Sequence, residues 1–362
     1  MTAIGDPFEA ISQSTPTFSD EVAVATARER YGLEVSVRSL VSERDQNFHM
    51  LTTDGRQFVL KIANVAEPKE VTDFQIQALI HIADYVASHR SPISTPEILT
   101  TLDGNSHTVL DAPDGQHVAR VVSYVEGLPI AERQPSARLC RNMAIYLAHL
   151  GKALRDFEHS SSNQTLLWDL QQALSLRDLM NHIPTDSVRR NVGQTLDDFE
   201  TFALPYFAEV RRQVIHSDFN PDNVLTDARD PDVVVGVIDF GDMLTAPLIA
   251  DVAIGTSYAR PRDGNPLALI AEFLAGYHSV TPLTQQEIDM VFDLVKARLC
   301  ASIAILHWRI SFREPGDPYL EKTMADEFCA EKFLAEMMTI PRENAIQIFR
   351  QVCASEEIAG SG

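Results

Sequence analysis

Two short runs of β-branched residues in the middle of the chain each end in acids and amides. The first ends in His-Ser-Asp218-Phe-Asn-Pro-Asp-Asn223, and the second ends in Ile-Asp239-Phe-Gly-Asp242. A turn-rich connection, residues 226–232, separates them. We therefore expect two strands to deliver Asp218, Asn223 and Asp239 toward one edge.

Such a set of side chains suits the transfer of a phosphoryl group. One carboxylate must accept or orient a hydroxyl proton, and further oxygen ligands must hold Mg²⁺ against the phosphates of a nucleotide. The catalytic loop of protein kinases pairs an Asp with an Asn at the offset seen between Asp218 and Asn223. In those enzymes a strand then leads to Asp-Phe-Gly, as it does here at Asp239.

Lys61 is a lysine within an otherwise apolar strand, Phe58-Val-Leu-Lys-Ile62. Lysine is rarely buried unless it is paired, and kinases carry their phosphate-binding lysine in a similar strand. This pattern predicts that Lys61 contacts the α- and β-phosphates. Alternation along the strand leaves a second interpretation open, in which Lys61 lies with Val59 on the solvated face of a hairpin.

An acid on the following helix is expected to pair with Lys61. The candidates are Glu70 and Asp73, of which Asp73 is preferred. Aligning the apolar residues of this helix with related kinases brings Gln75 close to the expected position, so the partner of Lys61 stays open.

The elements that must position these residues fall into two groups. The N-terminal part is predicted to be rich in strands, with strands over 33–41, 47–52, 56–62, 106–110 and 117–125, and helices over 19–31 and 69–87. The C-terminal part is predicted to be mostly helical, with helices over 136–157, 165–182, 187–211 and 247–353 around a β-rich island over 213–240.

A break in regularity at residues 126–129 marks the expected boundary between these parts. It divides the chain into a nucleotide-covering lobe, residues 1–125, and a helical lobe with the catalytic and metal-binding loops, residues 126–362. Strands and helices segregated in this order indicate an α+β protein with two lobes rather than a repeated βαβ unit.

The motif His216-x-Asp218-x-x-x-x-Asn223, followed by Ile-Asp239-Phe-Gly241, resembles the aminoglycoside phosphotransferase and choline kinase superfamily. That superfamily has a protein-kinase-like fold. The resemblance implies that Asp218 is the catalytic base, that Asn223 and Asp239 bind Mg²⁺, and that His216 braces the loop through hydrogen bonds.

Two further acids follow from the same resemblance. Asp251 matches a superfamily element that braces the structure without touching the substrate, and Asp242 is expected near the metal or the substrate.

The nucleotide is expected to be ATP, with GTP as an alternative donor. The segment 42–47, which should cover the phosphates, contains no glycine, so side chains such as those of Ser42, Gln46 and Asn47 would have to donate hydrogen bonds. The hinge that binds adenine through its backbone is placed by fold analogy at Ser123-Tyr124-Val125.

The segments Asp156-Phe-Glu-His159 and Leu166-Leu-Trp168-Asp169 resemble the hydroxylysine kinase branch of this superfamily, and the resemblance extends roughly over residues 20–340. It implies a small hydroxylated amine as acceptor, with Trp168 and Asp169 lining its pocket. A core position for Trp168 is an equal alternative. Aminoglycoside, homoserine and choline acceptors stay open, as does a catalytically inactive nucleotide-binding protein.

The composition disfavours two classes of partner, nucleic acid and anionic membranes. The chain has 362 residues and a net charge of −21, which disfavours nucleic acid and anionic membranes as partners. No apolar run approaches the ~18 residues that cross a bilayer. The first ten residues lack a basic segment before an apolar run, which predicts a cytoplasmic protein without a signal peptide. The oligomeric state is not predicted.

Overall fold

The computed structural model describes residues 15–42, 44–130, 135–311 and 329–360. Its chain divides into two compact units, each assembled from separate segments. The smaller unit comprises Met1–Glu126, Phe157–Thr165 and Gly236–Gly241, and the larger unit comprises Gly127–Asp156, Leu166–Val235 and Asp242–Gly362. The predicted α+β class is confirmed, because most strands lie in the smaller unit and most helices in the larger one. The assignment of separate roles to residues 1–125 and 126–362 stays a prediction.

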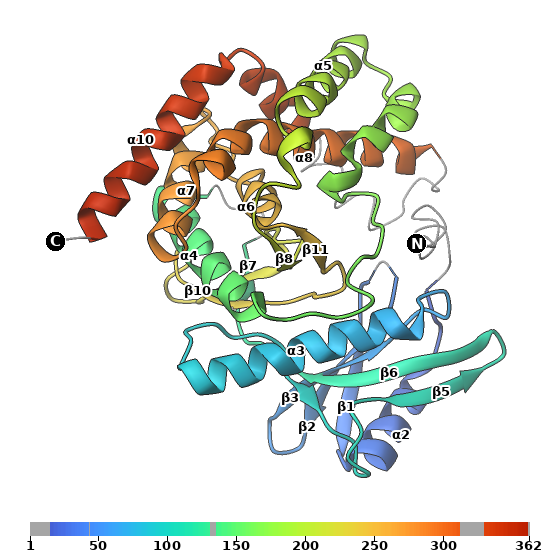
Figure 1. Cartoon of the computed structure of the whole chain (residues 1–362). Coiled ribbons are helices and arrows are strands. Elements are labelled where there is room, and N and C mark those ends of the chain that lie inside the picture. The colour runs from blue at the N-terminus through green and yellow to red at the C-terminus, as the bar shows by residue number, and fades with distance from the viewer. Residues whose placement is uncertain (1–14, 43, 131–134, 312–328, 361–362) are drawn as a thin grey trace. The chain divides into compact units, whose positions relative to one another are not determined.

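The smaller unit is built around a six-stranded sheet with the strand order β1-β2-β3-β6-β4, to which β5 adds by pairing with β6. Figure 1 shows this sheet with the helices α2 and α3. The bounds are α2 Asp20–Tyr31, β1 Val35–Leu40, β2 Gln46–Thr52, β3 Gln57–Ile62, α3 Lys69–His89, β4 Ile98–Leu99, β5 Thr108–Ala112 and β6 Gly115–Ser123.

The two faces of this sheet differ in chemistry because side chains alternate along each strand. Phe48, Leu60 and Val121 lie on the face that packs against buried residues of α2. The opposite face carries a polar row across three strands, in which Asn47 pairs with Lys61 and Lys61 pairs with Arg120. The sheet therefore places two cations side by side on adjacent strands.

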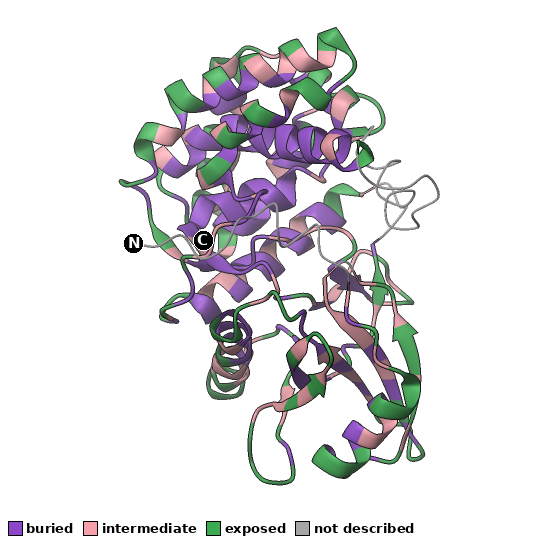
Figure 2. Ribbon diagram, turned by 90° about the vertical axis from the view of Figure 1, so that its right-hand side faces the viewer, coloured by how far each residue is buried: buried purple, intermediate pink, exposed green. Residues whose placement is uncertain are grey.

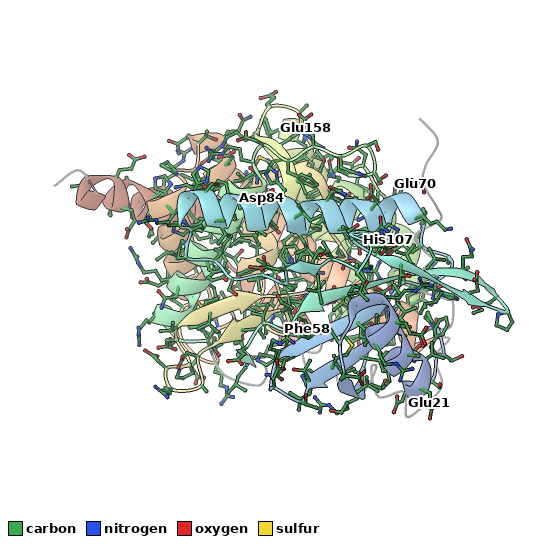
Figure 3. All side chains as sticks on the ribbon, turned by 90° about the horizontal axis from the view of Figure 1, so that it is seen from below. Glu21, Phe58, Glu70, Asp84, His107 and Glu158 are labelled. Atoms are coloured by element: carbon green, nitrogen blue, oxygen red, sulfur yellow. The ribbon has the colours of Figure 1, made fainter. Side chains whose placement is uncertain are left out.

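Helix α3 packs through an apolar stripe that includes Phe74, Ile76, Leu79 and Ile82. Glu70, near its start, and Asp84, nearer its end, are exposed (Figure 3). The ring of Phe74 also stacks on that of Phe157, with centroids 5.9 Å apart. This contact is one of several that join residues 157–165 to α3.

The larger unit contains the strands β7, β8, β9 and β11 and most of the helices. Strand β11 pairs with β8, and β9 pairs with β7 and with β10, which begins in the larger unit and ends in the smaller one. Helices α6 and α8 are buried over most of their length, and Figure 2 shows such buried residues in purple. The bounds are β7 Leu128–Pro129, α4 Ala137–Leu154, η1 Leu170–His182, α5 Asp186–Phe202, η2 Leu204–Tyr206, β8 Arg212–Ile215, β9 Val224–Thr226, β10 Val234–Val237, β11 Leu244–Pro247, α6 Leu248–Thr256, α7 Ala268–Val280, α8 Gln285–Ile310 and α10 Arg342–Gly360.

The structure differs from the sequence-based expectation in several local elements. The helix expected over 165–182 is a 3₁₀ helix that begins only at Leu170, and the one expected over 187–211 ends at Phe202. A proline, Pro205, follows that end and lies within a separate 3₁₀ turn that begins at Leu204. The short strands β4, β7 and β11 were not predicted.

The N-terminal ten residues, on which the prediction of no signal peptide rests, lie outside the described residues. In the part of the chain that the structure describes, no helix is both long and apolar enough to span a bilayer.

Candidate active site

The segment that contains Asp218 follows strand β8 and is held in an unusual backbone conformation. Ser217 has a φ of 64°, in the left-handed region that residues with side chains rarely adopt. Its N–H donates to Asp251 Oδ1 at 2.9 Å, and the N–H of His216 donates to Asp251 Oδ2 at 3.1 Å. Burial raises the pKa of Asp251 to about 6, and these two hydrogen bonds act against that rise.

Asp218 lies at the centre of a local hydrogen-bond network. Its N–H donates to His216 Nδ1 at 3.3 Å. Its two carboxylate oxygens accept from Asn220 Nδ2 at 2.8 Å and from Asn223 Nδ2 at 2.7 Å. His216 and Asp251 both contact backbone of this segment, and their bracing role stays a prediction.

Asn223 is suited to bind a cation through its side-chain oxygen. Its Nδ2 donates both to the Asp218 carbonyl oxygen, at 2.9 Å, and to the Asp218 carboxylate. This orients the amide, and no described residue donates to Oδ1. Mg²⁺ prefers oxygen ligands such as amide carbonyls and carboxylates. The Oδ1 atom of Asn223 is such an oxygen, and the Asp218 carboxylate lies beside it. Asn223 and Asp239 lie in different units of the chain.

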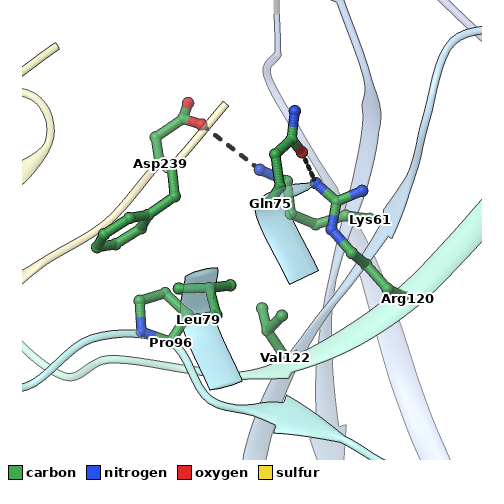
Figure 4. Close-up of a pocket in the computed structure, with 8 residues that line it drawn as sticks. Lys61, Gln75, Leu79, Pro96, Arg120, Val122 and Asp239 are labelled. Carbon is green, nitrogen blue, oxygen red and sulfur yellow. Dashed lines mark hydrogen bonds and ion pairs between the residues drawn. The ribbon is translucent and has the colours of Figure 1, made fainter. Parts of the chain in front are cut away.

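Asp239 begins a tight turn in the smaller unit. It has a φ of 60°, and its Oδ1 accepts from the N–H of Gly241 at 3.4 Å. The same oxygen lies 3.5 Å from Nζ of Lys61. Figure 4 shows this ion pair at the edge of a small pocket that Leu79 and Val122 also line.

The structure favours one of the two interpretations of Lys61 and corrects the choice of its acidic partner. The Lys61 side chain is only 17% exposed and pairs with Asp239, so it does not lie on a solvated hairpin face. Asp73, the preferred partner, instead contacts His159 Nε2 at 3.2 Å. Among the described residues, neither Asp73 nor Glu70 forms an ion pair with Lys61.

The segment expected to cover the phosphates is anchored elsewhere through Gln46. Its side chain makes two hydrogen bonds to the backbone of Phe18, at 2.7 Å and 2.8 Å. Asn47 lies beside Lys61 in the sheet, and its Oδ1 is buried without a hydrogen-bond partner in the described chain. Ser42 is half-buried and lies two residues after the end of β1, and Glu43 lies outside the described residues.

The predicted hinge begins at Ser123, the last residue of β6. The N–H of Ser123 donates to Glu97 O at 2.9 Å, and that of Tyr124 donates to Gln57 O at 3.2 Å. The N–H of Val125 has no acceptor in the described part of the chain, although Val125 itself is buried. Of the three residues, Val125 is therefore the one with a free backbone donor.

The predicted acceptor-pocket residues lie in the larger unit. Asp169 is 4% exposed and caps η1, where its Oδ1 accepts from the N–H of Gln171 at 2.9 Å. Burial raises the pKa of Asp169 to about 6, against the lowering effect of Gln171 and Arg212. Trp168 is half-buried, and Asp242 is buried.

One network beside Lys61 was not anticipated. Arg120 is 2% exposed, and its Nη2 donates to Gln75 Oε1 at 2.5 Å (Figure 4). Gln75 Nε2 lies 3.3 Å from Glu67 Oε1 and 3.4 Å from the carbonyl oxygen of Gly241. A signal for it was available, because Arg120 interrupts an apolar strand as Lys61 does.

Comparisons with known proteins relate the chain to one group of enzymes. Residues 36–286 match the model of the "Phosphotransferase enzyme family". A hydroxylysine kinase of Bos taurus is 27% identical over 98% of this chain and 98% of its own length. A homoserine kinase of Zymomonas mobilis is 26% identical over 84% of this chain and 91% of its own.

Solved structures share the fold. A microcompartment-associated aminopropanol kinase matches 93% of this chain and 98% of its own, with a TM-score of 0.65 and 18% identity. An amicoumacin kinase in complex with AMP-PNP and Ca²⁺ matches 90% of this chain and 95% of its own, with a TM-score of 0.65 and 15% identity.

Proposed function

The chain belongs to the phosphotransferase enzyme family, and from that premise we propose that it transfers the γ-phosphoryl group of ATP or GTP to a hydroxyl of a small amino-bearing metabolite, with hydroxylysine as the first candidate. The match to a hydroxylysine kinase over nearly the whole of both chains supports an alcohol as the acceptor group. The observation that carries the proposal is the Asp218 segment, in which a strained backbone and a fixed Asn223 surround one partly exposed carboxylate.

The larger unit supplies the base. Asp218 would take or orient the proton of the acceptor hydroxyl, because its carboxylate is held by Asn220 and Asn223 while the side chain stays partly exposed. Asp242 is proposed to lie near the metal or the acceptor. The roles of Trp168 and Asp169 in the acceptor pocket stay proposals.

The smaller unit supplies the nucleotide site. Lys61 would contact the α- and β-phosphates. Its ion pair with Asp239, a proposed metal ligand, supports a place for its ammonium group beside the bound nucleotide. Asn47 and Ser42 would donate to the phosphates. The free N–H of Val125, beside Ser123 and Tyr124 in the hinge, would bind the nucleotide base.

A divalent cation, proposed as Mg²⁺, would be held by Asn223 Oδ1 and the Asp239 carboxylate. When bound, it neutralises phosphate charge during transfer. The donor set fits a hard cation, since both ligands are oxygens. A cytoplasmic location is likewise part of the proposal.

A screen of ADP or GDP release tests the proposal. Wild-type protein with Mg²⁺ and either ATP or GTP is assayed against 5-hydroxylysine, homoserine, amino alcohols, choline and aminoglycosides. Homoserine is included because a homoserine kinase is among the relatives. We expect acceptor-dependent release that is greatest with hydroxylysine. A flat response to every acceptor would favour a nucleotide-binding protein without turnover.

The Asp218→Asn variant tests the base. It keeps the size and shape of the side chain but cannot accept a proton, and only one of the two amides of Asn220 and Asn223 can still donate to it. We expect kcat to fall about 10²- to 10⁴-fold while nucleotide affinity is retained. Asp222→Asn, an exposed acid in the same loop, is the matched control. Unchanged kcat in Asp218→Asn would remove Asp218 from the catalytic role.

A further inference from the structure

Gln75 is a buried amide in the first half of α3 that touches three other segments of the smaller unit. The residue as a whole is 2% exposed. Its oxygen accepts from Arg120 on β6, and its nitrogen faces Glu67, before α3, and Gly241, after Asp239. Because Arg120 can only donate, the amide oxygen is fixed toward it and both N–H groups are directed at acceptors.

Gly241 closes the turn that begins at Asp239. The Gly241 N–H points back to Asp239 Oδ1, and the Gly241 carbonyl oxygen receives the contact from Gln75 at 3.4 Å. Through this contact α3 is tied to the turn that carries the carboxylate paired with Lys61. The contact crosses 166 residues of sequence, so it connects elements that the chain itself does not hold together.

We propose that Gln75 is a positioning residue that holds the Asp239 turn through the Gly241 carbonyl, and that Arg120 and Glu67 fix which way its amide faces. This inference rests on the proposed function. It predicts that the chain requires an amide at position 75 and that a carboxylate there is harmful.

The charges around Gln75 explain why a carboxylate would fail. A Glu at this position could still accept from Arg120, but it has no donor for the Gly241 carbonyl. It would also face Glu67, whose pKa is already raised by desolvation and by Asp45, against the lowering effect of Arg120 and of Arg44. Two carboxylates in contact repel each other, and the repulsion would push the Asp239 turn away from α3.

The first experiment compares Gln75→Met and Gln75→Glu with Gln77→Met and Gln77→Glu. Gln77 is an exposed residue on the same helix whose side chain donates a hydrogen bond to Asp73, which makes it a matched control. We expect both Gln75 variants to raise the Mg²⁺ concentration for half-maximal nucleotide binding about tenfold, as outer-shell substitutions at metal sites do. The KM for the acceptor should not change.

A charge swap separates positioning from charge balance. In the double variant Glu67→Gln with Gln75→Glu, Arg120 keeps an acceptor and the two carboxylates no longer meet. We expect its thermal stability to return to that of the wild type, while the Mg²⁺ requirement stays raised because Gly241 still lacks its donor. Full recovery of the Mg²⁺ requirement would overturn the inference, since charge balance alone would then explain Gln75.

A ligand-free measurement keeps the inference distinct from the proposed function. Amide hydrogen exchange across residues 236–243 should quicken in Gln75→Met and not in Gln77→Met, whether or not the protein turns over any acceptor. Unchanged exchange and unchanged Mg²⁺ dependence in Gln75→Met would overturn the inference. Absence of turnover with every acceptor in the wild type would instead count against the proposed function.

Discussion

Two residues of the proposed active site hold backbone angles that side chains normally disfavour. Ser217 and Asp239 have φ angles of 64° and 60°, and the third such non-glycine residue in the described chain, Arg90, ends helix α3. Strain of this kind costs about 1–3 kcal/mol per residue and persists only where the surroundings enforce it. For Ser217 the enforcing group is Asp251, whose carboxylate accepts the N–H groups of Ser217 and His216.

Replacing Asp251 by alanine should therefore affect both stability and catalysis. The change leaves two buried N–H groups without acceptors, at a cost of about 1–3 kcal/mol each. Urea unfolding should show this loss, and kcat should fall because the Asp218 segment loses its fixed conformation. Asp289→Ala, which removes a partly exposed pair with Arg350, is the control and should cost at most about 1 kcal/mol. Equal stability of the two variants would contradict the bracing role.

Lys61 can be tested through nucleotide affinity. Lys61→Met keeps the apolar stem but removes the charge, so we expect the Kd for nucleotide to rise about tenfold or more and kcat to fall. Lys69→Met removes a lysine whose Nζ contacts Gln116 at the surface, and it should leave both quantities unchanged. Nucleotide titration calorimetry measures the effect, and an unaltered Kd in Lys61→Met would exclude phosphate contact.

The elements with strong local patterns could be predicted from the sequence, whereas those formed by distant pairing could not. Strand β3 alternates in burial as expected, and the hairpin turn at Asp54-Gly55 has the positive φ of 86° that glycine permits. Strand β11 exists because Leu244 lies opposite Ile215, about thirty residues earlier, and no local pattern of four residues reveals that. The same limit applies to Asp73 and Gln46, whose partners His159 and Phe18 lie far away in sequence.

The 3₁₀ helix η1 offers a test of what its cap does. Ionising the Asp169 carboxyl costs free energy in the folded protein, because burial raises its pKa from 3.8 to about 6. The contribution of the protonated carboxyl to the free energy of unfolding is fully present below pH ~4 and is lost as the pH rises through ~6. Asn is as good an N-cap as Asp and carries no charge. In Asp169→Asn the stability relative to wild type should therefore improve by up to about 3 kcal/mol between about pH 4 and about pH 8.

The measurement for Asp169→Asn is urea unfolding at both pH values, together with the KM of the acceptor. If the carboxylate only caps η1, KM stays constant. If Asp169 also contacts the amino group of the acceptor, KM rises in the variant, and the proposed pocket role is supported. A relative stability that is independent of pH would contradict the raised pKa.

At the scale of the whole molecule, the proposed site draws on segments scattered over most of the chain. Lys61, Asp239 and Gly241 meet in the smaller unit although nearly 180 residues separate the first two in sequence. The motifs predicted which residue types take part, because the chemistry requires them. They did not predict which groups pair, since Gln75 and Arg120 became neighbours only through the fold.

The net charge of −21 acts on every substrate, whichever residues bind it. A negative field attracts cations and repels anions, and salt screens both effects. Hydroxylysine carries a net positive charge near neutral pH, whereas homoserine carries none. If both are acceptors, only hydroxylysine should lose apparent affinity as salt screens the field.

Steady-state kinetics at two ionic strengths test this expectation. Raising KCl from about 20 mM to about 500 mM shortens the Debye length from ~20 Å to ~4 Å. At saturating nucleotide, the KM for hydroxylysine should rise several-fold while that for homoserine stays nearly constant, because only the former gains from long-range attraction. An equal rise for both acceptors would assign the salt effect to the site or to the nucleotide. An unchanged ratio of the two KM values would thus show that the overall charge does not select the acceptor.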